Sequence, residues 1–531
     1  MSKKPFKKSP IEFKQSLLFP ENIFDLLPND HESYVYSDIF KQLDTSSIEK
    51  KYKTIGQNAY HPKLIISILI YSYSRGEYSS RQIQRRCQED LSFMYIAKMQ
   101  CPNFRVLSNF RKDNIEFFEQ CFNQTVKIAI ELKLANLGHI SLDGSKFKAN
   151  TSKHKAMSYG RLKSNEKELE KEIAELIKKA SKYDQKEDLE YKEKTGYEIP
   201  EDLKHKKQRL NKIIKAKQAL EQREQENNPD KPISDKKQIS FTDTDACIMG
   251  SKGKGFDYHY NPQICTDKES QIIVAQHISQ KANDKQELKP ALEHLEETLT
   301  YVESRLQLTA QDDDLETQQT LKNIKDKTPQ NLTIDNGYMS GENLQTIEDK
   351  NINAYVAINK GEKKNPQSLD QSERKIEKSD FNYNEQDDSF TCPIGQKLSL
   401  IQTNKNGRKI YQAKQSSCQN CSYYQRCCKS KQGKSRSLTT DAKEPLRIKM
   451  KQKMEQKSSQ EIYSHRKTIV EPVFGQIKNK GFRGFSLRGL EKVQGEFSLV
   501  CATHNIKKIF KAIATGLIRP EFIKRENKAM N

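Results

Sequence analysis

Hydrophobic residues at helical spacing mark the first part of the chain. Within 61–73, apolar side chains recur every three or four positions, which predicts a helix with one buried face. Ser79 or Ser80 then caps a second, basic helix, and a third short apolar run covers 90–97. We therefore predict a helical N-terminal domain over 1–130. This succession suits a helix-turn-helix module that binds DNA, and it equally suits a plain helical domain whose arginines are solvated.

The pattern changes after residue 137 to short buried strands that alternate with helices. One strand ends at Asp143 and another at Asp335. Asp284 and Glu287 have the spacing of a capping box, which predicts the start of a helix. Alternating strands and helices indicate an α/β core with parallel strand pairing. The other runs that support this core are strands at 259–267, 270–278 and 353–358 and a helix at 341–350.

Two stretches do not fit this core, and we predict that they are insertions. From about residue 160 to 225, leucines at helical spacing stand among alternating charges, which is typical of an exposed helical arm. A later stretch is irregular, basic and rich in cysteine. The predicted parts beyond the N-terminal domain are the core at 137–150 and 240–360, the arm at 151–239, the cysteine-rich insertion at 361–455, a helical region at 456–512 and a basic tail at 513–531.

Charge narrows the class of partner. The 531 residues include 92 Lys and Arg against 71 Asp and Glu, a formal net charge of +21, which attracts polyanions. Nucleic acid is the leading expected partner and an anionic membrane surface is the second. No run approaches the roughly 18 apolar residues of a membrane span, and the start lacks the apolar segment of a signal peptide. We therefore expect no membrane partner and a cytoplasmic, nucleoid-associated protein with reduced cysteines.

Three acids are candidates for chemistry on DNA. Asp143 and Asp335 each follow a predicted strand and precede a glycine-containing turn, and functional groups of an α/β sheet gather at the carboxyl ends of its strands. Glu471 lies beside an apolar stripe, with Lys467 and Lys478 near the same helix face. Cutting a phosphodiester with two metal ions requires hard oxygen ligands of this kind. An acid after a strand also commonly caps a turn, so a purely structural role stays open.

Three blocks of sequence carry a resemblance to a known family. They resemble, in this order, the three signature regions of DDE transposases, in the branch of bacterial insertion sequences of the IS four superfamily. The blocks are LDGSKFKANTSKHKAM (142–157), TIDNGYMSGENL (333–344) and VEPVFGQIK (470–478). The stretch 59–90 is similar to the helical domain that precedes the catalytic domain in that branch. The arm also recurs there, as do the phrases FTDTDACIM (241–249) and FTCPIGQKL (390–398).

The resemblance implies an RNase H-like catalytic core and a mechanism with two Mg²⁺ ions, which Mn²⁺ can replace. Asp143 would contact both ions, and Asp335 and Glu471 would each complete one. Water would nick the end of a mobile element, and the freed 3′-hydroxyl would attack another strand without a covalent protein–DNA intermediate. The implied partners are double-stranded DNA, as terminal inverted repeats and as target, and a second copy of the chain in a homodimer.

The match to the family's Tyr-Arg-Glu-Lys signature is shifted by one residue at two places. Lys478 matches the lysine, but Lys467 occupies the arginine position, and Arg466 and Tyr463 each stand one place early. We therefore take Arg466, Lys467 and Lys478 as the candidates for holding DNA phosphate, although lysine does not grip phosphate bidentately as arginine does. The chain has no Trp, so a flipped base would need another aromatic side chain to stack on.

Cysteines gather within the second insertion, where a CxxC pair stands in a segment poor in apolar residues. Four thiolates can close a tetrahedral structural zinc site, which would stabilise such a segment. The predicted ligands are Cys392, Cys418, Cys421 and Cys427, and Cys428 is the alternative fourth ligand. Incidental thiols are the competing interpretation.

Two other functions remain open at this stage. A non-catalytic DNA-binding protein is the second interpretation, although all three acid positions are filled. A metal-dependent nuclease that cuts without strand transfer is the third. Asp243 and Asp245 are interpreted as turn residues or supports of the site rather than as metal ligands. Because the chain lacks a glycine-rich phosphate loop, nucleotide hydrolysis has no support.

Overall fold

The computed structural model of the chain describes residues 22–52, 59–152, 156–190, 201–227, 229, 231–251, 255–306, 315–358, 374–404, 407–428 and 433–522. The end of the predicted basic tail and the first part of the cysteine-rich insertion lie outside these residues. The chain packs into two units, Met1–Phe110 with Ile509–Asn531, and Arg111–Lys508. Across these ranges, no helix combines the length and apolar character that crossing a membrane requires.

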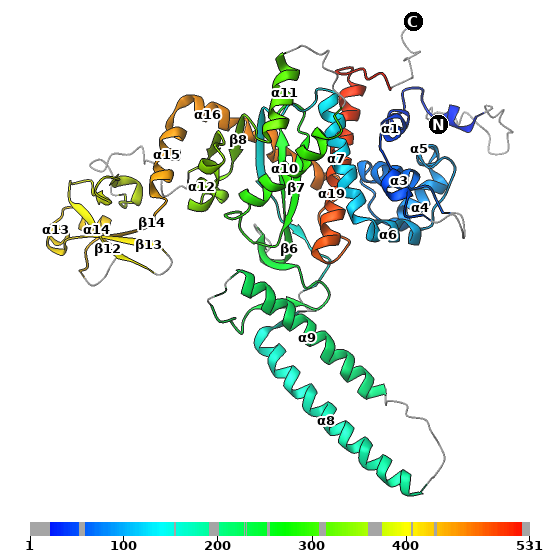
Figure 1. Cartoon of the computed structure of the whole chain (residues 1–531), viewed down its shortest axis with the longest axis horizontal. Coiled ribbons are helices and arrows are strands. Elements are labelled where there is room, and N and C mark those ends of the chain that lie inside the picture. Colours follow the sequence, from blue (N-terminus) through cyan, green and yellow to red (C-terminus); the bar gives the residue numbers. More distant parts are fainter. Residues whose placement is uncertain are drawn as a thin grey trace, which may run out of the picture. The chain divides into compact units, whose positions relative to one another are not determined.

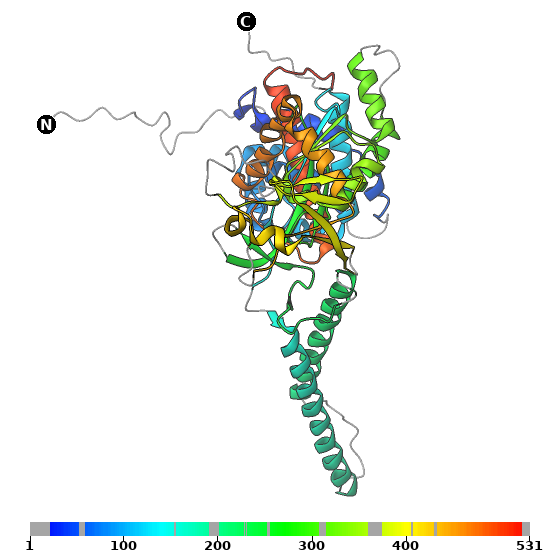
Figure 2. The same ribbon diagram turned by 90° about the vertical axis from the view of Figure 1, so that its left-hand side faces the viewer.

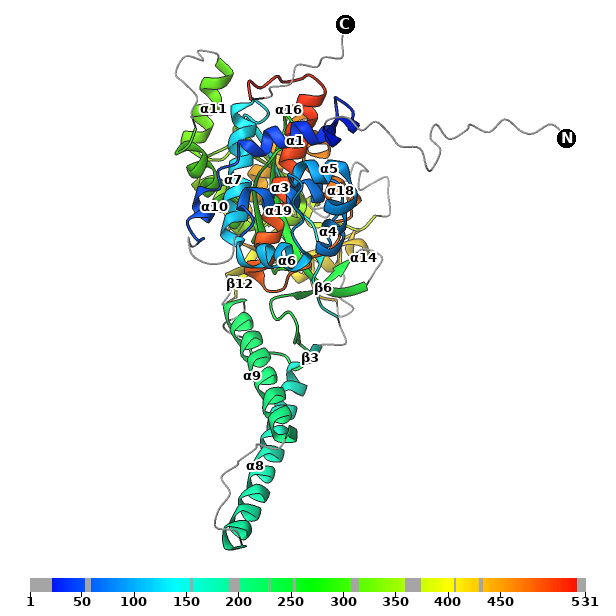
Figure 3. The same ribbon diagram turned by 90° about the vertical axis from the view of Figure 1, so that its right-hand side faces the viewer.

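Short helices build the first unit (Figure 3). They are η1 (Ile23–Leu26), α1 (Glu32–Lys41), α2 (Ser46–Glu49), α3 (Pro62–Ser74), α4 (Ser80–Glu89), α5 (Leu91–Ile96) and most of α6 (Phe104–Asp113). The helix predicted over 61–73 is confirmed as α3, and it is buried along nearly its whole length. On the basic helix α4, Arg81 lies over the Phe104 ring, 4.9 Å from its centroid, and Arg85 pairs with Glu89 at 3.3 Å.

A mixed sheet forms the centre of the second unit (Figure 1). Its strands β7 (Ile273–Ser279), β6 (Gly255–Asp267), β1 (His139–Gly144), β8 (Asn331–Ile334) and β9 (Ala354–Val356) are neighbours in that order. The β1–β8 and β8–β9 pairs are parallel, and the β1–β6 and β6–β7 pairs are antiparallel. The first half of β6 also pairs with β2 (Phe147–Lys148) and β5 (Cys247–Ser251). The predicted α/β class is therefore confirmed, and the predicted parallel pairing holds for β1, β8 and β9 but not for β6 and β7.

Helices pack against this sheet. They are α7 (Ile115–Glu131), α10 (Leu288–Glu303) and α19 (Leu490–Ala514), whereas α11 (Leu315–Asp326) and α12 (Gly341–Asp349) contact α10. Asn505 of α19 binds the edge strand β7, because its side chain accepts from the backbone N–H of Ile273 and donates to the carbonyl of Ile273, both at 2.8 Å. The sequence-based boundary at 130 places α7 in the N-terminal domain, whereas the packing places α7 in the second unit.

The predicted capping box at the start of α10 is wrong. Glu287 precedes the helix, but its side chain makes no cap hydrogen bond. Its buried carboxylate instead lies 3.0 Å from Nε2 of His277. Oδ1 of Asp284 accepts hydrogen bonds from the side-chain amides of Asn261 at 2.8 Å and Gln263 at 2.9 Å. Because tertiary partners take both carboxylates, the local capping pattern is not realised.

The helical arm consists of α8 (Tyr159–Glu190) and α9 (Glu201–Asn227), which lie side by side (Figures 1 and 2). At a rise of 1.5 Å per residue, α8 is roughly 48 Å long. A small apolar cluster that includes Leu162, Ile213 and Leu220 holds the two helices together near the base. There the strands β3 (Ala156–Ser158) and β4 (Gln238–Ser240) pair, and the hydroxyls of Thr151 and Ser240 lie 2.6 Å apart. The helical character predicted for the arm is confirmed.

The sequence predicted that the cysteine-rich insertion is irregular, and this prediction is wrong. It contains a five-stranded antiparallel sheet of β10 (Asn382–Asn384), β11 (Ser389–Thr391), β12 (Lys397–Thr403), β13 (Arg408–Ala413) and β14 (Ser437–Asp441), in sequence order. Its core includes Phe390, Leu398 and Tyr411. Hydrophobic periodicity did not reveal these strands, because β12 is mostly exposed and β10 and β11 have only three residues each. Short helices α13 (Gln415–Gln419), α14 (Tyr424–Cys427), α15 (Glu444–Glu455) and α16 (Lys457–Ser464) complete this region.

Candidate active site

Asp143 and Asp335 lie at the same edge of the sheet. β1 and β8 are parallel, and their register pairs Leu142 with Ile334. Asp143 is the next residue of β1 and Asp335 directly follows β8, so the two stand beside each other where strands are about 4.8 Å apart. The sequence predicted that both acids end strands, and the register shows that those strands are neighbours. Asp143 and Asp335 are therefore brought together.

Glu471 reaches this edge through a break between two helices. α17 (Arg466–Ile469) ends at Val470, and α18 (Glu471–Asn479) begins with Glu471 and has Pro472 in its first turn. Proline lacks a backbone N–H but fits the first turn of a helix, which explains the break. Glu471 is half-exposed, with its side chain 49% accessible, whereas Asp143 is 20% accessible.

Arg466 joins the first and third acids. Its Nη2 lies 2.8 Å from Oδ1 of Asp143, and its Nη1 lies 2.9 Å from Oε1 of Glu471. The side chain of Arg466 is only 7% exposed. The break after α17 lets an arginine five positions before the glutamate make the contact.

The charges of this cluster are interdependent. Burial raises the pKa of Asp143 to about 6, Arg466 opposes the rise, and the carboxylates of Asp335 and Asp284 add to it. Burial alone would lower the pKa of Arg466, but the acids around it, Asp143 foremost, leave that pKa raised. Removing negative charge from water is costly, and one guanidinium does not offset it fully. The site therefore favours additional positive charge.

The three predicted phosphate-binding residues differ from one another in their surroundings. Lys478 donates a hydrogen bond from Nζ to Oγ of Ser145 at 2.6 Å and lies 4.7 Å from the centroid of the Phe147 ring. Burial lowers the pKa of Lys478, while the charge of Asp143 acts in the opposite direction. Lys467 is exposed on α17, and nothing in the described ranges joins it to the three acids by a hydrogen bond or ion pair. Arg466, rather than Lys467, contacts the acids.

Sequence reasoning missed a fourth carboxylate at this edge. Asp284 follows β7, and a Cβ added to Gly144 would lie 2.9 Å from its Oδ1. A Cβ added to Gly337 would lie 3.3 Å from its Oδ2. Glycine after Asp143 therefore leaves room for Asp284 beside the first acid. The signal that was available is that Asp284, like Asp143 and Asp335, comes shortly after a buried strand.

Asp243 and Asp245 serve as supports, as interpreted. Asp243 is buried and accepts hydrogen bonds from the hydroxyl of Tyr260 at 2.8 Å and from the backbone N–H of Gly489 at 3.2 Å. Asp245 accepts from the backbone N–H of Leu490 at 2.8 Å. Both carboxylates therefore fix the segment that leads from α18 to α19.

The donor set fits a hard divalent cation. Carboxylate oxygens are the ligands that Mg²⁺ and Mn²⁺ prefer. Among the described residues, no three His, Cys, Asp or Glu side chains are already placed to hold a metal ion. The guanidinium of Arg466 lies between the carboxylates of Asp143 and Glu471, where it supplies the positive charge that a cation would bring.

Comparison with protein families gives two matches. Residues 391–510 match the family model described as a transposase DDE domain, and residues 21–113 match the one described as a transposase domain (DUF772). Together, the two matches indicate a DDE transposase of insertion-sequence type. Its function is therefore that of a transposase, a DNA-binding and DNA-cleaving enzyme in general terms. No curated protein and no solved structure matches the transposase.

The matched ranges include some of the candidate residues. Glu471, Arg466 and Lys478 of the transposase lie within the DDE-domain match. Asp143 and Asp335 lie outside both matches, so their assignment depends on the three sequence blocks and on the strand register.

Some of the cysteines in the cysteine-rich insertion of the transposase lie close together. The thiols of Cys418, Cys427 and Cys428 are close enough to influence one another, and all cysteines are free. Backbone N–H groups donate to the sulfur of Cys392 at 3.2 Å and of Cys421 at 3.3 Å, as happens around metal-binding thiolates. The described residues form no preassembled metal cluster, so the zinc site stays a prediction, which the zinc content of the purified transposase would check.

The acid cluster is expected to destabilise the metal-free transposase above neutral pH. Asp143 has a pKa of about 6 in the folded state against 3.8 for an unperturbed group. At a pH where Asp143 is ionised in both the folded and the unfolded state, this difference lowers the free energy of unfolding by roughly 3 kcal/mol. The raised pKa means that stability is lost as the pH rises from about 4 through about 6. We therefore expect Asp143→Asn to raise the unfolding temperature at pH 8 but not at pH 4, measured in the presence of a chelator.

The control for this experiment is Asp326→Asn, at the exposed end of α11. It should change the unfolding temperature little at either pH. A lower unfolding temperature of Asp143→Asn at pH 8 would show that the contact with Arg466 outweighs the cost of burial.

Proposed function

We propose that this transposase cuts the ends of an insertion-sequence element and joins them to target DNA with a single carboxylate site. The observation that carries the proposal is the register that sets Asp143 beside Asp335, with Glu471 tied to Asp143 through Arg466. Three acids from distant parts of the chain share one edge of the sheet. This is the arrangement that metal-dependent phosphodiester chemistry requires.

The strand order supports an RNase H-like catalytic core. The central strands follow the order β7-β6-β1-β8-β9, with an antiparallel β7-β6-β1 part and a parallel β1-β8-β9 part. The first acid follows the central strand, and the second follows its parallel neighbour. The third comes from a helix after a long insertion, which is the order that the resemblance implies.

Asp143, Asp335 and Glu471 are the residues that would hold two Mg²⁺ or Mn²⁺ ions. When bound, such ions polarise the scissile phosphate and stabilise the charge on the attacking and leaving oxygens. The excess negative charge of the site supports this role, because three acids and Asp284 share one close guanidinium. With metal ions on its carboxylate partners, Arg466 would be free to bind DNA phosphate.

The cations near the acids orient the DNA. Lys478 stands on the face of α18 toward β1 and is fixed by Ser145 and the Phe147 ring, so its charge is held close to Asp143. Arg466 offers two nitrogens in a planar fork that suits a phosphate. Lys467 is exposed and would add sequence-independent attraction for the DNA backbone.

Two reactions follow at the same site. Water attacks the phosphorus at the element end, and the 3′ oxygen leaves with a proton, which gives a free 3′-hydroxyl and a 5′ phosphate. That hydroxyl then attacks a phosphorus of the target strand, whose own 3′ oxygen leaves. The number of phosphodiester bonds is unchanged in the second reaction, so no energy-rich cofactor is needed. The homodimer in the DNA complex and the nucleoid location stay predictions.

The test uses full-length protein, Mg²⁺ and duplex DNA taken from both sides of the coding sequence. We expect 3′-hydroxyl nicks at the element end, followed by covalent joining to a separate labelled duplex. A chelator should abolish both products. Nicks without joining would show a nuclease, and DNA binding without nicks would show a non-catalytic protein. Either result would overturn the proposal.

A further inference from the structure

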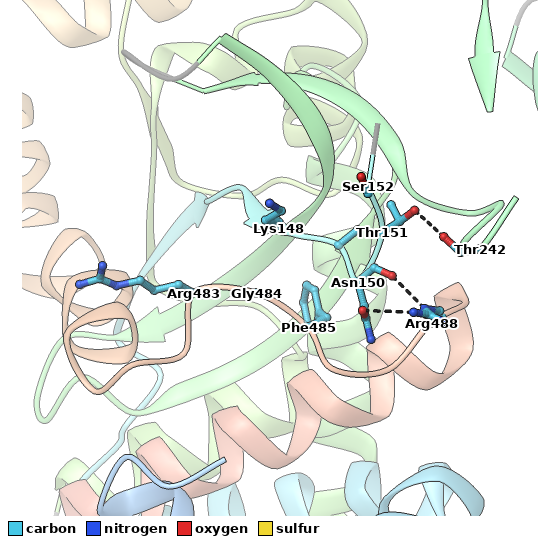
Figure 4. A pocket seen from close by; sticks show the side chains of 10 residues that line it. Lys148, Asn150, Thr151, Ser152, Thr242, Arg483, Gly484, Phe485 and Arg488 are labelled. Carbon is cyan, nitrogen blue, oxygen red and sulfur yellow. Dashed lines mark hydrogen bonds between the residues drawn. The ribbon is translucent and has the colours of Figure 1, made fainter. Parts of the chain in front are cut away.

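A pocket with several polar and charged side chains lies beside β2 in the second unit (Figure 4). It encloses about 540 Å³ and is walled by residues 148–152, Thr242 and the segment from Arg483 to Arg488. Ligand pockets of such size are usually lined by apolar side chains. This one adds hydroxyls, an amide and three cations to a partly apolar lining. Its chemistry therefore suits an anionic, hydrogen-bonding ligand.

The pocket is built by the docking of one segment onto β2. Lys148 and Gly484 form a parallel bridge, in which the backbone N–H of Phe485 donates to the carbonyl of Lys148 at 2.9 Å. A Cβ added to Gly484 would lie 2.8 Å from that carbonyl oxygen, so only glycine permits the approach. Phe485 is buried against the aromatic core, which anchors the segment from below.

The cations of the pocket are poorly neutralised. Arg483 is exposed, and the parts of the chain that the structure describes give its guanidinium no carboxylate partner. Lys148 is 59% exposed and lies 3.4 Å from Asp257, a surface pair that contributes little. Arg488 donates from Nε to the carbonyl of Asn150 at 2.8 Å, so it meets a neutral group. The pocket therefore keeps a net positive charge.

The pocket is close to the acids along the chain. Lys148 stands five positions after Asp143, and even a fully extended stretch of this length spans no more than about 18 Å. DNA rises by about 3.4 Å per nucleotide of one strand, so this distance corresponds to about five nucleotides. Arg483 and Arg488 stand at the two ends of the docked segment, with Lys148 on the strand beside it (Figure 4).

From this geometry we infer that the pocket binds the phosphate backbone of DNA within about five nucleotides of the cut. The inference rests on the proposed function for the position of the cut, but the binding itself needs neither metal nor cleavage. Lys148 and Arg483 contact phosphates, while Arg488 and Asn150 hold the wall in place. The hydroxyls of Thr151 and Thr242, which lie close together, complete a surface that recognises backbone rather than sequence.

The test measures DNA binding by the double variant Lys148→Gln/Arg483→Gln in the full chain, with a chelator present. Both side chains are exposed, so the fold should be retained. Each lost phosphate contact lowers the slope of log K against log salt by about 0.9, so we expect a slope smaller by about 1.8. If the two proteins bind equally at 1 M salt, the variant binds roughly 60-fold more weakly at about 0.1 M.

The matched control is Lys322→Gln/Lys325→Gln, which removes the same charge from exposed positions of α11. Its slope should fall clearly less than that of the pocket variant. Equal changes in the two variants would overturn the inference, because net charge alone would then explain the effect.

Neutral methylphosphonate linkages locate the contact. Placed one at a time near the cut, they should weaken binding by wild-type protein at one or two positions and leave the pocket variant unaffected there. One arm places them in the element end and the other in the target duplex, which identifies the strand bound. Additive losses at every position in both arms would overturn the inference. Because no step requires cutting, failure of the proposed catalysis gives a separate result, the absence of nicks by wild-type protein with Mg²⁺.

Discussion

Changing Asp143 to asparagine is expected to slow DNA cleavage by about a thousandfold or more, with DNA affinity nearly unchanged. The same result is expected for Asp335→Asn and Glu471→Gln. Each substitution keeps the size of the side chain but removes the charge that a metal ion needs from its ligand. The measurement is the rate of 3′-hydroxyl nicking on end-labelled DNA with Mg²⁺, beside the DNA affinity of the same preparation.

Asp326→Asn is the control for these three variants, because it removes one carboxylate from an exposed helix end outside the site. It should cleave at the wild-type rate. If one of the three variants keeps more than about a tenth of that rate, its acid is wrongly assigned. Loss of DNA binding together with cleavage would instead indicate damage to the fold.

Replacing Phe147 with alanine is expected to lower the free energy of unfolding by about 3–5 kcal/mol. Phe147 is fully buried on β2 and packs against Phe474 of α18 at 6.0 Å and Phe482 at 5.6 Å between ring centroids. Truncation leaves a cavity between the strand that follows Asp143 and the helix that begins with Glu471. Denaturant unfolding measures the loss, and the cleavage rate should fall as well.

Phe256→Ala is the matched control, because that ring is 66% exposed at the start of β6. It should change the free energy of unfolding by less than about 0.5 kcal/mol. Equal losses for the two variants would contradict the packing described for Phe147. An unstable Phe147→Ala that still cleaves at the wild-type rate would show that the aromatic cluster does not position Glu471.

The first two acids were predictable because their signal is local. A buried strand that ends in an acid before a glycine turn can be read from a few residues, as at Asp143 and Asp335. That β1 and β8 are parallel neighbours is a long-range fact, which no local period contains. The block order of the resemblance supplied this link before the structure did.

The cation that contacts Glu471 could not be predicted from local sequence. The sequence placed Lys467 at the position of the family arginine, by counting along one helix. The backbone instead breaks after α17, and Arg466 makes the contact with Glu471. Pro472 indicates that a helix begins or kinks at this point, but it does not indicate how the preceding side chains are oriented. Counting sequence positions therefore did not show that Arg466, among the candidate cations, contacts Glu471.

The sequence analysis did not predict the position of Asp284 or the sheet of the cysteine-rich insertion, for different reasons. The spacing of Asp284 and Glu287 matched a local capping pattern, yet tertiary hydrogen bonds to Gln263 and His277 prevailed. In the insertion, short and mostly exposed strands such as β12 lack the alternation that marks a half-buried strand. Both misses arise where long-range partners, rather than neighbours in sequence, decide the structure.

The base of the arm has a thermodynamic consequence. Thr151 and Thr242, which close that base with Ser240, also belong to the wall of the pocket beside β2. A ligand on the two long helices that moves these shared residues would therefore shift the equilibrium of that wall. Linkage is reciprocal, so DNA held by the helices and DNA held at Lys148 would change each other's affinity by the same factor.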